Sequence, residues 1–359
     1  MTIYEVAINF HQKLKPFKFS RYKKIPYYLF RGLITRIRNA IVRHNTITVC
    51  EEERLSPCLV SMGRDWKHLT KAFLGHYKDL GFTSFIFLDN NSKDESVSHV
   101  IKEGNKLGCS ISIYRCNLDY KRYKYAMKNF LIASAPTESW ILCADSDEFL
   151  VLPKGVKDIK QIIEYLEKYN YDTVQFHLLD MFCDQPLRDL PNEVKWTSAN
   201  LENFYRYFDI STLKSTRVNG RIYSQHQGGV RMKHFGVNPL LTKSLFFKKT
   251  GVTNLISSHH LLTTVGSKKR KLADFSLFVK HYKFNSHYTT GLAIAIQENS
   301  YYDNNSECRP IFERLKEAPL YTFNRETTKV YQDCEQLRAC GFITFSKTFQ
   351  SYLDNTCNI

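Results

Sequence analysis

The sequence predicts an α/β fold in which a mostly parallel sheet is flanked by helices, for two reasons. First, short apolar runs alternate with helical patterns between residues 57 and 152, at a spacing typical of right-handed β-α-β units. Second, the runs are apolar at consecutive positions, which is typical of strands buried on both faces. The sequence contains neither GxGxxG nor GxxxxGK[ST], so no dinucleotide fingerprint or P-loop is predicted.

Each element has its own local signal. Helical spacing of apolar residues predicts the helices, one of which opens on the acidic turn Asp94-Glu95, while Gly108 and Pro136 follow two of the helix ends. The predicted strands are 57–62, 85–88, 109–114, 140–144 and 171–179. The predicted helices are 66–77, 94–108 and 120–135, with further helices from residue 290 onward.

The composition is that of a globular chain. It has 359 residues, 43% of them hydrophobic, and a formal net charge of +16. No run of 18 apolar residues predicts a transmembrane helix, and the N-terminus lacks the layout of a signal peptide. Ten scattered cysteines without a CxxC pair argue against a zinc site or a disulfide framework, so we expect reduced thiols in a cytoplasmic protein. The positive charge favours polyanions, anionic membranes or phosphorylated substrates.

Three segments are predicted: a basic N-terminal segment (1–55), a central domain (56–290) and a helical C-terminal extension (291–359). From Lys13 to Arg43 there are ten Lys and Arg residues and no acidic one, and apolar residues at 30, 33, 34, 37 and 41 follow helical spacing. Such a helix either lies on an anionic membrane surface or packs on the protein's own core with its basic face in water.

The most informative stretch is WILCADSDEFLVL, residues 140–152. A buried strand leads directly into Asp145, Ser146, Asp147 and Glu148. Side chains alternate along an extended chain, so Asp145 and Asp147 are expected to point the same way, at the edge of the sheet where open α/β folds bind ligands. Two such carboxylates suit Mg²⁺ or Mn²⁺. The alternative is a strand that runs into an acidic, solvated turn.

The order of these blocks resembles the GT-A glycosyltransferases, and most of all a family-2-like group with an Asp-x-Asp-Glu-Phe signature. The residues that carry the resemblance are Arg64-Asp65 after the first strand, FLDNNSKDES at the end of the second, and DSDEF at 145–149. The resemblance covers about 56–152 and continues more loosely through QGGVRMKHFG (227–236), residues 241–244, SSHHLL (257–262) and LFVKHYKF (277–284).

The resemblance implies a role for particular side chains. Asp145, Asp147 and His281 would hold the metal ion, with His259 and His260 as competitors for the histidine position. Asp89 would contact the nucleotide base, and the alternative is that Asp89 in DNNS simply makes an Asx-turn. The remaining residues expected to bind substrate are Arg64, Arg231 and Lys243.

An inverting enzyme of this group also needs a base for the acceptor hydroxyl. The family's usual Glu-Asp block is not evident in this sequence. Asp180, Asp184 and Asp209 are all candidates, and Asp180 is chosen because it ends the strand predicted at 171–179. Glu148 could act on the acceptor or bond a backbone amide, and the sequence does not decide between these.

The resemblance therefore predicts a metal-dependent glycosyltransferase that uses a nucleotide-sugar donor and a glycan or lipid-linked acceptor, in the synthesis of a surface polysaccharide or lipopolysaccharide. Peripheral contact with the inner face of a membrane is expected from the basic N-terminus, and nucleic acid is not an expected partner. Two alternatives stay open: a nucleotidyltransferase on a similar sheet, and a non-enzymatic nucleic-acid-binding protein. A nucleotidyltransferase usually has a Gly-rich loop after its first strand, whereas the corresponding residues here, MGRDWK (62–67), contain one glycine. A nucleic-acid-binding protein would be expected to have a recognisable binding motif, and the sequence contains none.

Overall fold

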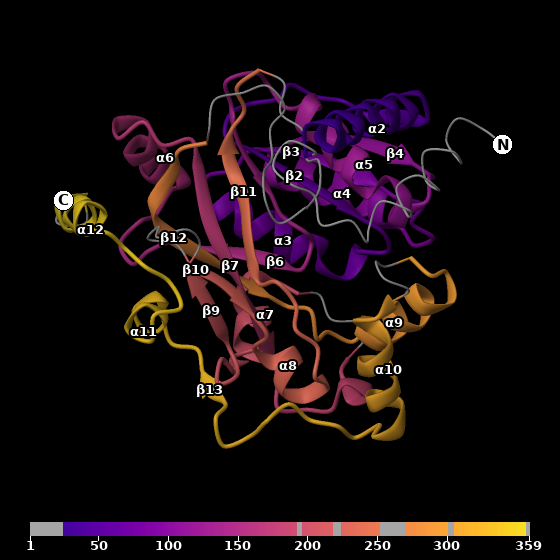
Figure 1. Cartoon of the computed structure of the whole chain (residues 1–359), viewed down its shortest axis with the longest axis vertical. Helices are drawn as coiled ribbons and strands as arrows, with labels where there is room; N and C mark the ends of the chain where they lie inside the picture. The colour runs from indigo at the N-terminus through magenta and orange to yellow at the C-terminus, as the bar shows by residue number, and fades with distance from the viewer. Residues whose placement is uncertain (1–23, 192–195, 218–223, 252–269, 301–304, 357–359) are drawn as a thin grey trace.

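The computed structural model describes residues 24–191, 196–217, 224–251, 270–300 and 305–356. Its main feature is a large central sheet flanked by helices (Figure 1), which confirms the predicted α/β class. The strand order along the sheet is β1-β4-β3-β2-β5-β11-β7-β12-β6. Strands β8 and β13 extend from β7, and β9 and β10 form a separate pair.

The first half of the sheet follows the predicted β-α-β order. Its elements are β2 (Cys58–Gly63), α3 (Lys67–Asp79), β3 (Ser84–Asp89), α4 (Ser96–Leu107), β4 (Ser110–Cys116), α5 (Tyr120–Ser134) and β5 (Trp140–Cys143). The four strands pair in parallel, and every residue of β3 and β5 is buried. Local signals set the helix ends: Gly108 takes a left-handed conformation after α4, and the Asp119 side chain accepts a hydrogen bond from the Arg122 amide before α5.

The second half is mixed in direction. Its elements are β6 (Glu148–Val151), α6 (Ile159–Lys168), β7 (Thr173–Phe182), η2 (Leu187–Asp189), α7 (Ser198–Phe204), β8 (Tyr207–Phe208), β9 (Lys214–Arg217), β10 (Ser224–Gln227), α8 (Val230–Phe235), β11 (Thr242–Lys248) and β12 (Leu272–His281). Strand β11 is antiparallel to both β5 and β7, while β12 is parallel to β7.

These pairings align the strands that matter for the site. Because β11 is antiparallel to its two neighbours, β7 and β12 run in the same direction as β2, β3, β4 and β5. The carboxyl ends of these six strands therefore lie at one edge of the sheet. Strands β6 and β11 run the opposite way, so their first residues lie at that same edge.

The N-terminal segment contributes to the sheet. Helix α2 (Lys24–His44) leads into β1 (Thr46–Cys50), which pairs antiparallel with β4 as an edge strand. The predicted helical spacing is confirmed over the described residues of this segment, and Val42 is completely buried. The sheet thus begins before residue 55, where the predicted boundary lies. No helix among the described residues is long and apolar enough to cross a membrane.

The C-terminal part is largely helical, as predicted. Its elements are α9 (Tyr288–Gln297), α10 (Cys308–Glu317), β13 (Lys329–Val330), α11 (Cys334–Ala339) and α12 (Lys347–Thr356). It packs on the central domain: the Ser276 amide of β12 donates to the Thr344 carbonyl at 2.8 Å, and Phe349 of α12 stacks on Phe275 with ring centroids 3.8 Å apart.

Candidate active site

The candidate site is a cluster of charged side chains at the common edge of the sheet. Asp145 and Asp147 lie in the turn between β5 and β6, and Glu148 is the first residue of β6. His281 is the last residue of β12 and pairs with Glu148 in the ladder. The direction of the strands thus brings together groups that lie far apart in the sequence.

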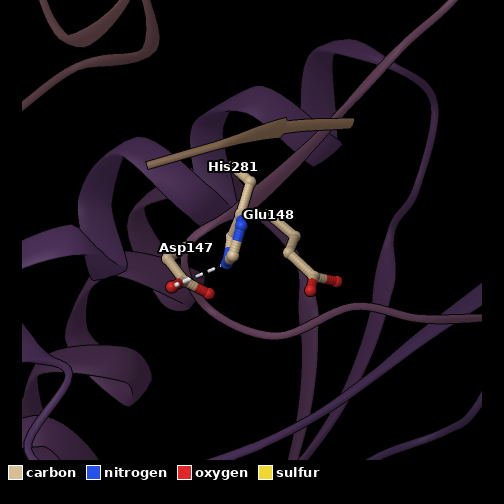
Figure 2. A group of neighbouring side chains, drawn as sticks. All are labelled: Asp147, Glu148 and His281. Carbon is tan, nitrogen blue, oxygen red and sulfur yellow. Dashed lines mark ion pairs between the residues drawn. The ribbon is translucent and has the colours of Figure 1, made fainter. Parts of the chain in front are cut away.

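Three side chains at this edge are placed to hold a metal ion: Asp147, Glu148 and His281 (Figure 2). One ligand atom from each lies within 4.8 Å of the others. Two carboxylates and an imidazole are donors that suit Mn²⁺ or Mg²⁺. The Asp147 side chain keeps 26% of its surface exposed, whereas the Glu148 and His281 side chains keep 2% and 7%. A ligand from solvent therefore reaches this group from the side of Asp147.

His281 is held between two carboxylates. Its Nδ1 lies 2.6 Å from Asp180 Oδ1, and its Nε2 lies 3.3 Å from Asp147 Oδ2. Burial alone would lower the pKa of His281, but the two carboxylates outweigh it and raise that pKa to about 9. The ring is thus oriented by Asp180 with Nε2 toward Asp147, which is the carboxylate–histidine arrangement found behind many metal-binding histidines.

Asp180 is itself fixed by a buried cation. Arg231 of α8 donates from Nε to Asp180 Oδ2 at 2.9 Å and from Nη1 to Glu307 Oε1 at 2.6 Å. The side chains of Asp180 and Arg231 are 2% and 6% exposed. Burial would raise the pKa of the Asp180 carboxyl, but Arg231 and His281 hold it well below its usual range. Asp180 is therefore an anchored carboxylate behind His281.

Asp145 occupies a different position, between two lysines. Lys128 of α5 donates to Asp145 Oδ1 at 2.9 Å, and Lys243 of β11 donates to Oδ2 at 3.0 Å. Burial opposes ionisation, but these ammonium groups hold the pKa of the Asp145 carboxyl well below its usual range. Lys243 also pairs with Glu148, and the Lys243 side chain is 2% exposed. A chain of alternating charge thus runs from Lys128 through Asp145 and Lys243 to Glu148.

Two of the three side chains expected to hold the metal ion lie in this group. The expected ligands were Asp145, Asp147 and His281, and the group with suitable geometry contains Asp147 and His281 together with Glu148. The Asp145 carboxylate has two ammonium partners, Lys128 and Lys243, whereas Glu148 has Lys243 alone. His259 and His260 lie outside the described residues.

Two residues expected to contact the donor are bonded elsewhere. The Asp89 side chain is completely buried. It accepts from Arg115 Nε at 2.8 Å and from the amide of Ser92, three residues further on, at 3.1 Å. Arg64 donates from Nη1 to both carboxylate oxygens of Glu298, each at 3.0 Å. The Arg115 side chain is 39% exposed, so at this point of the edge a cation, and not the Asp89 carboxylate, faces solvent.

The three candidates for the base differ in their surroundings, and Asp180, the one chosen, is the most enclosed by charged partners. Its carboxylate is buried and bonded to Arg231 and His281, so it has no open side from which to take an acceptor proton. Asp209 is also buried and bonded to Lys233. Asp184, which lies just after β7, is the exposed member of the three candidates.

Several residues of the cluster were missed from the sequence. Lys128 lies within α5, where a lysine is usually solvated, and Glu307 comes from a segment with no recognisable motif. The packing of α5 against the sheet brings Lys128 to the site, and the packing of α10 on α8 brings Glu307 to Arg231. Glu148 could be recognised from the sequence as a candidate, because it adjoins the two aspartates. Its pairing with Lys243 could not be predicted from the sequence.

Comparisons with known proteins give remote structural matches only. No family model and no curated protein matches the sequence. A crystal structure of S. aureus TarS aligns with 74% of this chain at 12% identity and a TM-score of 0.32, and this chain spans 44% of that one. A putative glucose-1-phosphate thymidylyltransferase from Bacillus anthracis, solved in complex with a sucrose, aligns with 82% of this chain and 98% of its own at 11% identity and a TM-score of 0.26. At TM-scores this low, we infer function from the side chains of the site alone.

Proposed function

We propose that this chain is a metal-dependent glycosyltransferase of the GT-A type, which transfers a sugar from a nucleotide-sugar donor to a glycan or lipid-linked acceptor. One observation carries the proposal: a metal-binding group of Asp147, Glu148 and His281 adjoins buried lysines at the carboxyl edge of an α/β sheet. The DSDEF motif, on which the resemblance to this enzyme class rests, supplies two of those three ligands.

The surroundings of His281 support a divalent cation at this group. A histidine that serves only to fill space does not need an anchored carboxylate behind it, whereas His281 has Asp180 on Nδ1 and presents Nε2 to Asp147. In the metal-free protein the positive charge on the imidazole balances the neighbouring carboxylates. When bound, Mn²⁺ or Mg²⁺ would supply Lewis-acid stabilisation of the departing diphosphate.

The lysines complete the electrostatics of such a reaction. Negative charge grows on a nucleoside diphosphate as it leaves the sugar, and fixed cations near the leaving oxygens stabilise that charge. Lys128 and Lys243 are held in place by Asp145, so they need no reorganisation during the reaction. Lys124, one turn before Lys128, is half-buried, and burial together with the charge of Lys128 lowers the pKa of Lys124. A bound diphosphate would relieve this repulsion between lysines.

The acceptor side of the proposal rests on charge and location. The net charge of +16 suits an acceptor at an anionic surface, such as a growing surface glycan or a lipid-linked one. We place this activity at the cytoplasmic face of a membrane, reached by peripheral contact. Asp184 is the exposed candidate for the base, because it follows the same strand end as the buried Asp180.

The first experiment is thermal unfolding with a panel of nucleoside diphosphates, with and without Mn²⁺. A ligand at about 100 times its dissociation constant stabilises the folded protein by about 2.7 kcal/mol. We expect one nucleotide to stabilise the protein only when Mn²⁺ is present, and we expect Asp147→Asn to abolish that effect. Asp79→Asn is the matched control, because Asp79 is exposed at the end of α3, which runs away from the site edge.

A nucleotidyltransferase is distinguished in the same assay. It would respond to a nucleoside triphosphate together with a sugar phosphate and would release pyrophosphate, whereas the proposed enzyme would respond to the diphosphate and release it. The absence of any metal-dependent nucleotide effect would remove both readings and leave the acidic turn as a structural feature.

A further inference from the structure

Helix α2 has one face covered by the rest of the protein. Val42 is completely buried, Ile41 packs against the core, and Asn129 of α5 donates a hydrogen bond to Asn39 at 3.1 Å. These contacts fix the helix on the outside of α5 (Figure 1) and determine which of its faces looks outward.

The outward face carries apolar side chains in water. Leu33 and Ile37, one turn apart, are 56% and 40% exposed, and on the following strand Ile47 and Val49 are 60% and 40% exposed. The described residues include nine exposed large apolar side chains, of which these are four. Such a concentration in one short stretch of chain marks an interaction surface.

The same face is cationic. Positions 33, 36, 37, 40, 43 and 44 recur at three- and four-residue spacing, so they share one side of the helix, and all six are exposed. Arg36 and Arg43 lie among them. Residues 24–50 contain five Lys and Arg residues and no acidic one. The next acids along the chain come after β1, where Glu51 pairs with Arg54 and Glu52 accepts from the Ile111 amide.

We propose that this face of α2 docks on the surface of a bilayer that contains anionic phospholipid. Leu33 and Ile37 enter the boundary between headgroups and acyl chains, and Arg36 and Arg43 contact lipid phosphates. The choice of partner follows from the charge, because an exposed apolar row flanked by cations and free of acids complements an anionic interface. The proposal rests on the peripheral contact within the proposed function, but not on its transfer chemistry.

The position of α2 connects this surface to the candidate site. Asn129 of α5 bonds α2, and the adjacent Lys128 bonds Asp145. The outward face of α2 and the charged cluster are thus separated by about two helix diameters, on the order of 20 Å. A lipid-linked acceptor at the interface would have to extend over that distance to reach the candidate metal-binding group.

The test is co-sedimentation of the full chain with vesicles of phosphatidylcholine, with and without phosphatidylglycerol. One double variant, Leu33→Ser with Ile37→Ser, removes the apolar row, and a second, Arg36→Gln with Arg43→Gln, removes the charge. The matched control changes exposed residues of the same kinds elsewhere, Leu320→Ser with Lys329→Gln. All variants are first required to unfold at the wild-type temperature.

We expect the wild type and the control to bind the anionic vesicles, and to bind pure phosphatidylcholine far more weakly. The apolar variant should lose at least about tenfold in affinity, and the charge variant about fivefold for each arginine removed, with a weaker dependence on salt. Wild-type protein that fails to sediment with the anionic vesicles, or variants that sediment as well as it does, would overturn the proposal.

Sedimentation velocity without vesicles tests whether a second copy of the chain, instead of a membrane, covers this face. A wild-type dimer that both double variants convert to monomer, with vesicle binding unchanged, would show that a second copy of the chain covers α2. Nucleotide binding in solution needs no membrane. If vesicle binding fails, the metal-dependent nucleotide effect still tests the proposed transfer activity independently.

Discussion

Replacing Lys243 by methionine should destabilise the protein strongly, because this side chain connects two acids of the site. Its ammonium group lies 3.0 Å from Asp145 Oδ2 and also pairs with Glu148, and the side chain is 2% exposed. Methionine keeps much of the length and apolar volume of lysine but removes the charge. Asp145 would keep Lys128 as a partner, whereas Glu148 would lose its ammonium partner.

The magnitude follows from the burial of Glu148. Removing one partner of a buried ion pair typically costs about 3–5 kcal/mol, because the other charge is left uncompensated. Burial already raises the pKa of Glu148 even with Lys243 present, so the orphaned carboxyl can relieve part of the penalty by taking up a proton. We therefore expect a loss near the lower end of this range, about 3 kcal/mol at neutral pH.

The assay is urea unfolding at pH 7 with Lys248→Met as the control. Lys248 lies on the same strand and pairs with Glu167 at 2.8 Å, but the two side chains are 26% and 46% exposed, so its loss should cost about 0–1 kcal/mol. Mn²⁺ should restore part of the stability of Lys243→Met, because Glu148 belongs to the group proposed to bind the metal ion. Equal losses for the two variants would refute the buried charge network.

Two further predictions test the anchoring of His281 and the packing of the sheet. Asp180→Asn should weaken Mn²⁺ binding by about 10–100-fold in calorimetry, because it removes the carboxylate that orients the histidine. Asp184→Asn, at an exposed position, should leave Mn²⁺ binding unchanged, and equal effects of the two would contradict the assignment. Gly104→Ala should cost about 1–3 kcal/mol in thermal unfolding, because its methyl group would lie 2.3 Å from Ile111 Cγ1. Gly75→Ala, in open space on α3, should be neutral or stabilising by up to about 1 kcal/mol, and similar losses at both sites would contradict this packing.

The first half of the fold was predictable because its signals are local. Four consecutive apolar runs, with Asp119, Gly108 and other end signals between them, determine where strands and helices begin and end. The turn after β5 was predictable for the same reason, since a strand that ends in DSDE places carboxylates at the sheet edge whatever packs around it.

The later part of the sheet was less predictable because its pairing is non-local. Strand β11 enters between β5 and β7 in the antiparallel direction, and no short pattern in residues 242–248 specifies those neighbours. That insertion brings Lys243 beside Glu148 and leaves β7 and β12 aligned with the first strands. The buried surroundings of Asp180 were not predictable for the same reason, since only the packing of α8 places Arg231 against it.

The sequence by itself determined the α/β class, the position of Asp147 at a strand end and the cationic, apolar pattern of α2. These depend on periodicity and on the residues at the ends of elements, which neighbouring positions in the chain decide. Only the tertiary structure decided which charges are paired. In the folded chain Asp145 pairs with two lysines, Glu148 and His281 lie beside Asp147, and Asp180 bonds the other side of the histidine ring. A buried charge is stable only when it is paired, and the element that packs against it supplies the partner.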